Sequence, residues 1–358
     1  MMKSVARIKD ISVTPLKAKL SQPFRTALGE HRVLENVLLS LTLEDGTRGY
    51  GEAAIATHIT GETVAETMKN LQRVGTRFIG RDARDYLKLS AETHEALPRN
   101  KAAVAAVEMA VLDALTRQWK IPLWKFFGDK PRPLTTDITI VIADLEETRA
   151  TARKFFKQGF RAFKIKIGRD PDLDYQRVLT VARIVKRGDI YLDANQGYSA
   201  EETLRFLKKL KSAGVVPALV EQPVPKHDWD GLKKVTRLGG VPVCADESVG
   251  SLPQAVRAIQ EKAAHVINIK VMKCGLMEAR EIALRARAAG VKLMIGGMME
   301  TSLAMTAAAH LASGLGGFDF IDLDTPFFIK EDQASRPYLS SRGVYDLRPV
   351  KAGIGVIP

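Results

Sequence analysis

Five ionisable residues recur at nearly regular intervals in the second half of this 358-residue chain. Each follows a short apolar, β-rich run, and neighbours in the series are 24 to 28 residues apart. In chain order they are Lys166, Asp193, Glu221, Asp246 and Lys270. A single carboxylate in such a place is an ordinary helix cap or loop charge. Five in equivalent places predict one shared site.

Three of the five are carboxylates, which would repel one another unless they bound a cation. Hard oxygen ligands favour Mg²⁺, and the set contains no Cys or His that would favour Zn²⁺. We therefore predict that Asp193, Glu221 and Asp246 bind one Mg²⁺ per active site. The flanking lysines would acquire lowered pKa values from burial and from the cation, which allows proton transfer near neutral pH.

A metal that holds a substrate carboxylate, with one amine on each side, suits proton transfer at the α-carbon. One lysine would remove the α-proton, the metal would stabilise the enediolate, and the opposite lysine would return a proton. The product would be a racemised or epimerised acid, so we predict an isomerase.

Eight short β-rich runs with helical stretches between them must position these residues. Residues at the carboxyl ends of parallel barrel strands share one mouth, so this pattern favours a (β/α)8-type barrel. An open doubly wound sheet is the alternative, but no G-x-G-x-x-G follows the first strands. The runs are TTDITIVIA, AFKIKIG, DIYLDAN, ALVEQP, VPVCADES, VINIKV, KLMIGGM and FIDLDTP.

The first ~130 residues differ from this pattern. Three predicted strands (7–16, 35–43 and 48–53) precede helical patterns, which indicates an α+β unit. We predict an α+β capping domain over residues 1–130, the barrel over 131–326, and a C-terminal segment, 327–358, that packs back on the capping domain.

Composition narrows the class of protein. Apolar residues make up 46% and charged residues 27%, and no apolar run approaches the roughly 20 residues of a membrane span. We expect a cytoplasmic homo-oligomer without membrane contact, in which Cys244 and Cys274 are reduced packing residues. The net charge is +13, but the basic residues recur at helical spacing and no nucleic-acid-binding motif accompanies them. We therefore expect no nucleic-acid partner.

The motifs KIK, DANQGY, VEQPV, ADES and INIK resemble the enolase superfamily, in particular its muconate-lactonizing-enzyme subgroup, along essentially the whole chain. The resemblance implies a modified (β/α)7β TIM-type barrel behind an N-terminal α+β capping domain. The subgroup includes cycloisomerases, o-succinylbenzoate synthases, N-acylamino acid racemases and dipeptide epimerases, so the motifs identify the subgroup better than the reaction.

The run FDFIDLDTP places Asp322 and Asp324 on one face of the last strand end. In dipeptide epimerases a D-x-D here binds the α-ammonium of the substrate, and PFRTAL and GGMMET also resemble that family. The resemblance implies an L,L-dipeptide whose C-terminal α-carbon is inverted. Lys166 and Lys270 would be the acid/base pair, with Lys164 beside the substrate carboxylate.

One departure affects the substrate. Members that act on Ala-Glu carry Arg after the TAL of the lid loop, where this chain has Gly29 and then Glu30. Either the pocket is neutral, or Glu30 turns it toward a basic side chain. Further residues follow from the same resemblance: for substrate contact Arg25, Ile55, Thr136 and Met298, in the lid Arg32 and His58, and beside the metal ligands Asn195 and Glu247.

Two alternatives stay open. The same site could serve an N-acylamino acid racemase, an o-succinylbenzoate synthase or a muconate-type cycloisomerase. A protein of another class, a non-catalytic binder of polyanions, would have no need of the complete Lys-Asp-Glu-Asp-Lys set.

Overall fold

Alternating apolar residues build an N-terminal antiparallel sheet in the computed structural model, which describes residues 6–186, 188–332 and 337–358. Its strands lie in the order β1 (Ile8–Thr26), β2 (Gly29–Leu43) and β3 (Arg48–Ala53). Val37, Leu39 and Leu41 are buried on one face of β2, as the two-residue period of a strand requires. The sheet and its helices form the cap; the helices are α1 (Thr57–Thr60), α2 (Val64–Phe78), η1 (Ala83–Asp85), α3 (Tyr86–Ala96), α4 (Lys101–Gln118) and α5 (Trp124–Phe127).

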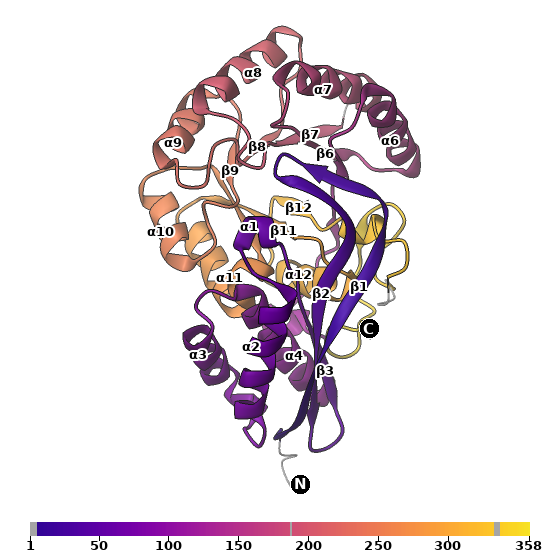
Figure 1. Ribbon diagram of the computed structural model, residues 1–358, viewed down its shortest axis with the longest axis vertical. Coiled ribbons are helices and arrows are strands. Elements are labelled where there is room, and N and C mark those ends of the chain that lie inside the picture. The colour runs from indigo at the N-terminus through magenta and orange to yellow at the C-terminus, as the bar shows by residue number, and fades with distance from the viewer. Residues whose placement is uncertain (1–5, 187, 333–336) are drawn as a thin grey trace.

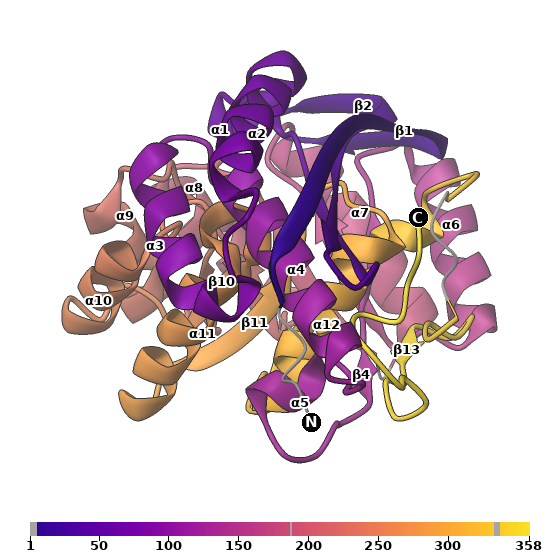
Figure 2. The ribbon, with the colours of Figure 1, turned by 90° about the horizontal axis from the view of Figure 1, so that it is seen from below.

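The first two strands are longer than the sequence predicts. Pairing continues beyond Lys17 and Glu35, whose side chains form an ion pair of 2.6 Å, to Thr26 and Gly29 at the tip. The expected lid loop is therefore largely a β-ribbon. Figures 1 and 2 show this ribbon reaching from the cap helices toward the barrel near α6 and α7.

The second half forms one eight-stranded parallel sheet, which confirms the predicted α/β TIM-type barrel. Strands that neighbour each other in the sheet, from β5 to β12, are also consecutive in the chain. Hydrogen bonds such as Asp137 N to Ile321 O (2.9 Å) join the first and last strands and close the barrel. The strands are β5 (Ile138–Ile140), β6 (Ala162–Lys166), β7 (Asp189–Asp193), β8 (Leu219–Glu221), β9 (Val243–Ala245), β10 (Val266–Lys270), β11 (Lys292–Gly296) and β12 (Phe320–Asp322).

Helices alternate with these strands, and side-chain caps fix where several begin. Ser199 and Glu202 form a reciprocal capping box at the start of α8, which satisfies backbone N–H groups that the helix leaves unpaired. Among the described residues no helix is long and apolar enough to cross a membrane. The helices are α6 (Leu145–Gln158), α7 (Pro171–Val185), α8 (Ala200–Ser212), α9 (Trp229–Leu238), α10 (Leu252–Gln260), α11 (Val271–Ala288), α12 (Ser302–Leu315) and η2 (Thr325–Phe327).

The C-terminal segment connects the barrel to the cap. Its strand β13 (Val344–Tyr345) pairs with β4 (Leu134–Thr135). Further on, Ile354 N donates to Asp113 Oδ1 of α4 at 2.6 Å. Helix α4 also meets α11, where Gly275 has a φ of +84° and a side chain would collide with Glu108.

Candidate active site

The five spaced residues lie at one end of the barrel on adjacent strands. Lys166, Asp193, Glu221 and Lys270 are the last residues of β6, β7, β8 and β10, and Asp246 directly follows β9. All are buried, with at most 6% of each residue exposed. The register pairs Lys166 with Asp193 and Asp193 with Glu221, so the structure brings the five together as their spacing predicts.

Lys164 is the centre of a buried ion-pair network. Its Nζ lies 2.9 Å from Asp193 Oδ2, 2.7 Å from Glu221 Oε2 and 2.7 Å from Asp322 Oδ2. Burial lowers the pKa of Lys164, but Asp193, Asp322 and the other carboxylates outweigh burial and hold this pKa well above its ordinary value. Lys164 therefore stays charged at neutral pH and can offset a substrate carboxylate.

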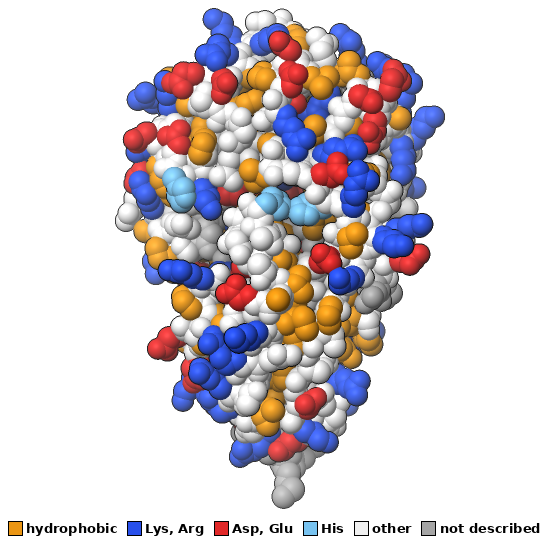
Figure 3. Space-filling model, viewed as in Figure 1, with side chains coloured by type: hydrophobic (Ala, Val, Ile, Leu, Met, Phe, Trp, Pro, Cys, Tyr) orange, Lys and Arg blue, Asp and Glu red, His pale blue; other side chains and the backbone are white. Residues whose placement is uncertain are grey.

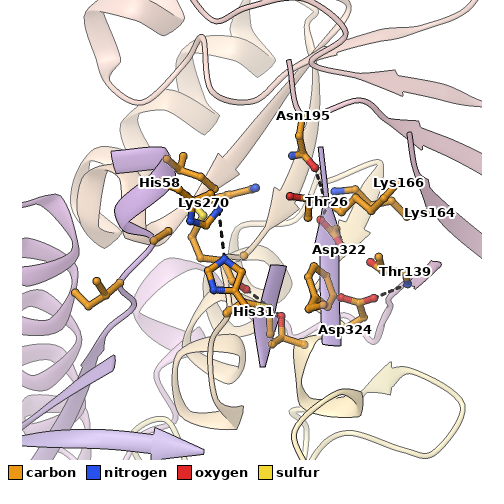
Figure 4. Close-up of a pocket in the computed structure, with 18 residues that line it drawn as sticks. Thr26, His31, His58, Thr139, Lys164, Lys166, Asn195, Lys270, Asp322 and Asp324 are labelled. Carbon is orange, nitrogen blue, oxygen red and sulfur yellow. Dashed lines mark hydrogen bonds and ion pairs between the residues drawn. The ribbon is translucent and has the colours of Figure 1, made fainter. Parts of the chain in front are cut away.

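Lys166 and Lys270 approach the same pocket with fewer partners. Lys166 Nζ donates to Asp193 Oδ2 (2.6 Å) and Asn195 Oδ1 (3.1 Å), and Lys270 Nζ donates to Asp246 Oδ2 (2.7 Å). Burial lowers the pKa of Lys270, but the carboxylates of Asp246, Glu221 and Glu247 together outweigh burial and hold this pKa above its ordinary value. Figure 4 shows Lys270 on one side of the pocket and the two lysines of β6 on the other.

The pocket lies between the cap and the barrel mouth and encloses, with its opening, about 650 Å³. In the space-filling view, histidine side chains border a hollow in the middle of one face, and basic side chains elsewhere on that face alternate with acidic ones (Figure 3). The residues that line the pocket are Phe24, Thr26, His31, Ile55, Ala56, His58, Ile59, Thr139, Lys164, Lys166, Asn195, Lys270, Gly297, Met298, Met299, Asp322, Asp324 and Thr325.

Asp193, Glu221 and Asp246 fit a bound Mg²⁺, because they offer a buried set made only of oxygens. Glu221 Oε2 accepts no hydrogen bond, although Lys164 Nζ lies 2.7 Å away. Burial and then the neighbouring Asp193 raise the pKa of Glu221 to about 8. A divalent cation bound there would stabilise the charged form of this carboxylate.

A fourth lysine, Lys273 in the first turn of α11, is a site residue that the sequence reasoning missed. Its Nζ donates to Asp246 Oδ1 at 2.8 Å and to Asn268 O at 3.0 Å. Burial raises the pKa of Asp246, but Lys270 and Lys273 outweigh burial and hold it below its ordinary value. The three-residue interval from Lys270 to Lys273 was the available signal.

A second group of carboxylates lies next to Lys164, whose Nζ is 2.7 Å from Asp322 Oδ2, and two of its members, Asp322 and Asp324, line the pocket wall. Oxygens of Asp137, Asp322 and Asp324 lie within 4.8 Å of one another. Asp324 Oδ2 accepts a 2.6 Å hydrogen bond from Thr139 N, whereas both oxygens of Asp137 lack a hydrogen-bond partner. Burial and then Asp322 raise the pKa of Asp324 to about 7. A cationic group of the substrate would stabilise the charged form of these carboxylates.

The predicted Mg²⁺ ligands do not form so tight a group among the described residues. In the part of the chain that the structure describes, the acidic side chains whose oxygens lie within 4.8 Å of one another are Asp137, Asp322 and Asp324. Lysine ammonium groups lie against the predicted ligands instead: Lys164 and Lys166 against Asp193, Lys164 against Glu221, and Lys270 against Asp246.

Four of the predicted substrate contacts lie outside the lining of the pocket in this structure: Arg25, Gly29, Glu30 and Thr136. Glu30 is held by Arg25 and Arg32, each with its Nε 2.7 Å from a Glu30 oxygen. Glu30 is therefore not turned toward a basic substrate side chain.

Thr136 is buried at the seam between β5 and β12, where its hydroxyl oxygen accepts from Leu323 N at 2.8 Å. Thr139, three residues further on, lines the pocket in its place. Thr139 is uncharged and lies within β5, so the spacing of ionisable residues at strand ends does not point to it.

Other predicted residues do lie at the site. Ile55, Met298 and His58 line the pocket, and His58 Nε2 lies 3.4 Å from Nε2 of His31, which was not predicted. Asn195 Nδ2 donates to Glu247 Oε1 at 3.4 Å, so these two lie together near the Asp193 side of the mouth.

Comparisons with known proteins agree with this geometry. Residues 147–358 match the enolase C-terminal domain-like family, and residues 8–128 match the N-terminal domain of the mandelate racemase/muconate lactonizing enzyme family. The chain is 50% identical to a hydrophobic dipeptide epimerase of Citrifermentans bemidjiense, with 98% of each chain covered. It is 40% identical to an aromatic dipeptide epimerase of Herpetosiphon aurantiacus, again over 98% of each.

A solved structure extends the comparison. The dipeptide epimerase of Enterococcus faecalis, complexed with Mg and the dipeptide L-Leu-L-Tyr, superimposes with a TM-score of 0.94 at 31% identity. The match covers 98% of this chain and 100% of that one.

Proposed function

The chain belongs to the mandelate racemase/muconate lactonizing enzyme family of the enolase superfamily, and on that basis we propose that it is a Mg²⁺-dependent dipeptide epimerase. It would invert the α-carbon of the C-terminal residue of an L,L-dipeptide. One observation carries the proposal: the pocket has lysines on two opposite sides and a pair of aspartates, Asp322 and Asp324, on its wall.

Lys166 and Lys270 would exchange the α-proton from opposite sides. Either amine, once neutral, takes the proton from its own side, and the other ammonium delivers a proton to the opposite side. Lys164 stays charged and compensates the negative charge that builds up on the substrate carboxylate. Asp193, Glu221 and Asp246 would hold one Mg²⁺, and the ion would supply Lewis-acid stabilisation of that charge. With the Asp246 carboxylate also held by the cation, Lys270 would feel less negative charge and its pKa would fall.

Asp322 and Asp324 support a substrate with a free amino terminus. Together with Asp137 they form a carboxylate-rich wall, which would attract an α-ammonium group and repel the carboxylate of a succinyl group. This favours a dipeptide over the N-acyl and succinyl substrates of the alternative reactions.

The apolar lining supports uncharged side chains on the dipeptide. Phe24, Ile55, Ile59, Met298 and Met299 line the pocket, and Glu30 is occupied by arginines. Of the two alternatives that Gly29 and Glu30 left open, the neutral pocket is therefore better supported. The name of the 50% identical relative, a hydrophobic dipeptide epimerase, agrees with it.

A dipeptide library in ²H₂O tests the proposal. We expect deuterium incorporation and inversion at the C-terminal α-carbon, with hydrophobic residues preferred. N-acetylated versions of the best substrates serve as the comparison. Turnover of the acylated compounds, with no exchange of any free dipeptide, would favour an N-acylamino acid racemase instead.

A further inference from the structure

The apolar walls of the pocket come from two separate parts of the chain. Ile55 follows β3 in the cap, whereas Met298 and Met299 belong to the loop after β11 of the barrel. The distance between these walls sets the room for a substrate side chain. Whatever fixes this distance therefore influences which side chains the pocket accepts.

One buried amide is bonded to the backbone of both walls. Asn36, 1% exposed on β2, accepts at Oδ1 a hydrogen bond from Ile55 N (2.9 Å). Its Nδ2 donates to Met299 O at 2.8 Å. Asn36 does not line the pocket, so it contacts the wall residues rather than the substrate.

A buried carboxylate strengthens the connection. Asn36 Nδ2 also donates to Glu52 Oε1 at 2.6 Å, and Thr301 N donates to the same oxygen at 3.0 Å. The Thr301 hydroxyl donates to the other Glu52 oxygen. Asn36, Glu52 and Thr301 are each at most 1% exposed, and at such burial a broken hydrogen bond leaves polar groups unpaired.

We infer that Asn36 is a positioning residue for substrate specificity, because it fixes the spacing of Ile55 and Met299. The inference rests on the proposed dipeptide epimerase function and deepens it, since it assigns side-chain selectivity to a residue outside the pocket. Loss of this amide frees the two walls from each other. The pocket then discriminates less between large and small side chains.

Asn100 provides a matched control in the same cap. It is 4% exposed, and its Nδ2 donates to Glu62 Oε1 (3.0 Å) and Thr67 Oγ1 (3.1 Å). Its Oδ1 accepts from Asn70 Nδ2 at 3.0 Å. None of these partners lines the pocket, so Asn100→Ala removes a comparable set of bonds without touching the walls.

The test compares kcat/KM for the best hydrophobic dipeptide with kcat/KM for a dipeptide of clearly different side-chain size. In Asn36→Ala we expect the ratio to fall toward one by about tenfold, the scale of discrimination that an apolar pocket supplies. The ratio in Asn100→Ala stays at the wild-type value. An equal loss of kcat/KM for both substrates in Asn36→Ala would overturn the inference.

Amide hydrogen exchange tests the same point without activity, so it still applies if the wild type epimerises no dipeptide and the proposed function fails. In Asn36→Ala the Ile55 amide and the amides of 297–301 should exchange faster than in the wild type and in Asn100→Ala. Unchanged exchange at both segments would contradict the inference.

Asn36→Asp separates the two bonds. It keeps an oxygen for Ile55 N–H but loses the donor to Met299 O and to Glu52 Oε1, which also holds Thr301 N, so the 297–301 loop should exchange faster while Ile55 stays protected. Equal acceleration at Ile55 would count against the assignment. Failure of both Asn36 variants to fold, while Asn100→Ala folds, would overturn it as well, because Asn36 would then support the whole cap.

Discussion

Lys164 and Lys166 lie two residues apart on β6 and differ in their partners. Lys164 Nζ is within 2.9 Å of three carboxylates, which keep it protonated, whereas the carboxylate within reach of Lys166 is that of Asp193. A residue that cannot lose its proton is a poor base but a good electrostatic partner. This difference supports Lys166 as the acid/base group and Lys164 as the partner of the substrate carboxylate.

Asp324→Asn tests the ammonium-binding role at the residue scale. The amide oxygen can still accept from Thr139 N, but the charge that would meet the substrate ammonium is lost. We expect kcat/KM for free dipeptides to fall roughly 30-fold, equivalent to about 2 kcal/mol.

Asp319→Asn is the control for this variant. Asp319 lies at the other end of the same strand, where its Oδ2 accepts from Leu293 N at 3.2 Å. Steady-state kinetics of the two variants should differ sharply. Equal activities would argue that Asp324 does not bind the ammonium group.

At the scale of elements, the strands of the barrel could be predicted from the sequence, whereas the full length of the lid ribbon could not. All eight barrel strands were predicted, because buried parallel strands are short apolar runs that end in polar residues. The β1–β2 ribbon was missed beyond residue 16, although the exposed Lys17 between buried Leu16 and Ala18 continues the alternation of a strand, because the pairing is irregular between Lys19 and Phe24. The arrangement of Glu30 between two arginines depends on this pairing, so the sequence could not exclude Glu30 from the pocket.

His310 joins three elements and gives a prediction about pH. Its Nδ1 accepts from Trp124 N, and its Nε2 donates to Ile354 O, both at 2.9 Å, so the ring must be neutral. Burial lowers the pKa of His310 from 6.5 to about 4. The unfolded chain therefore binds the proton more tightly, and the contribution of His310 to stability is lost as the pH falls from 6.5 toward 4.

His310→Gln keeps one donor and one acceptor but cannot titrate. The wild type should lose about 3 kcal/mol more unfolding free energy than this variant between pH 7 and pH 4. Denaturant unfolding at several pH values measures this difference. A constant difference between the two proteins across that range would contradict the assignment.

At the scale of the whole molecule, the site exists only where cap and barrel meet. The barrel supplies the lysines and carboxylates, and the cap supplies Phe24, His31 and Ile55. The C-terminal segment returns to α4 through the bond between Ile354 and Asp113 and so connects both parts. The homo-oligomer expected from the sequence stays a prediction that solution scattering can address.

Removal of the metal tests the proposed Mg²⁺ site. Chelation should abolish epimerisation, and Mg²⁺ should restore it with one ion per chain, measured by calorimetric titration. Because the ion binds only the folded chain, saturating Mg²⁺ at about 100 times its Kd should raise the unfolding free energy by about 2.7 kcal/mol. Glu221→Gln should lose both effects, and full activity in chelator would refute the site.

The central claim is that Lys166 and Lys270 act on opposite sides of one α-carbon. The most direct measurement follows deuterium incorporation from ²H₂O into each epimer of the best dipeptide with Lys166→Ala and Lys270→Ala. We predict that neither variant epimerises, and that each can exchange only the epimer whose α-proton faces its remaining lysine. Exchange of both epimers by either single variant would contradict the two-lysine mechanism.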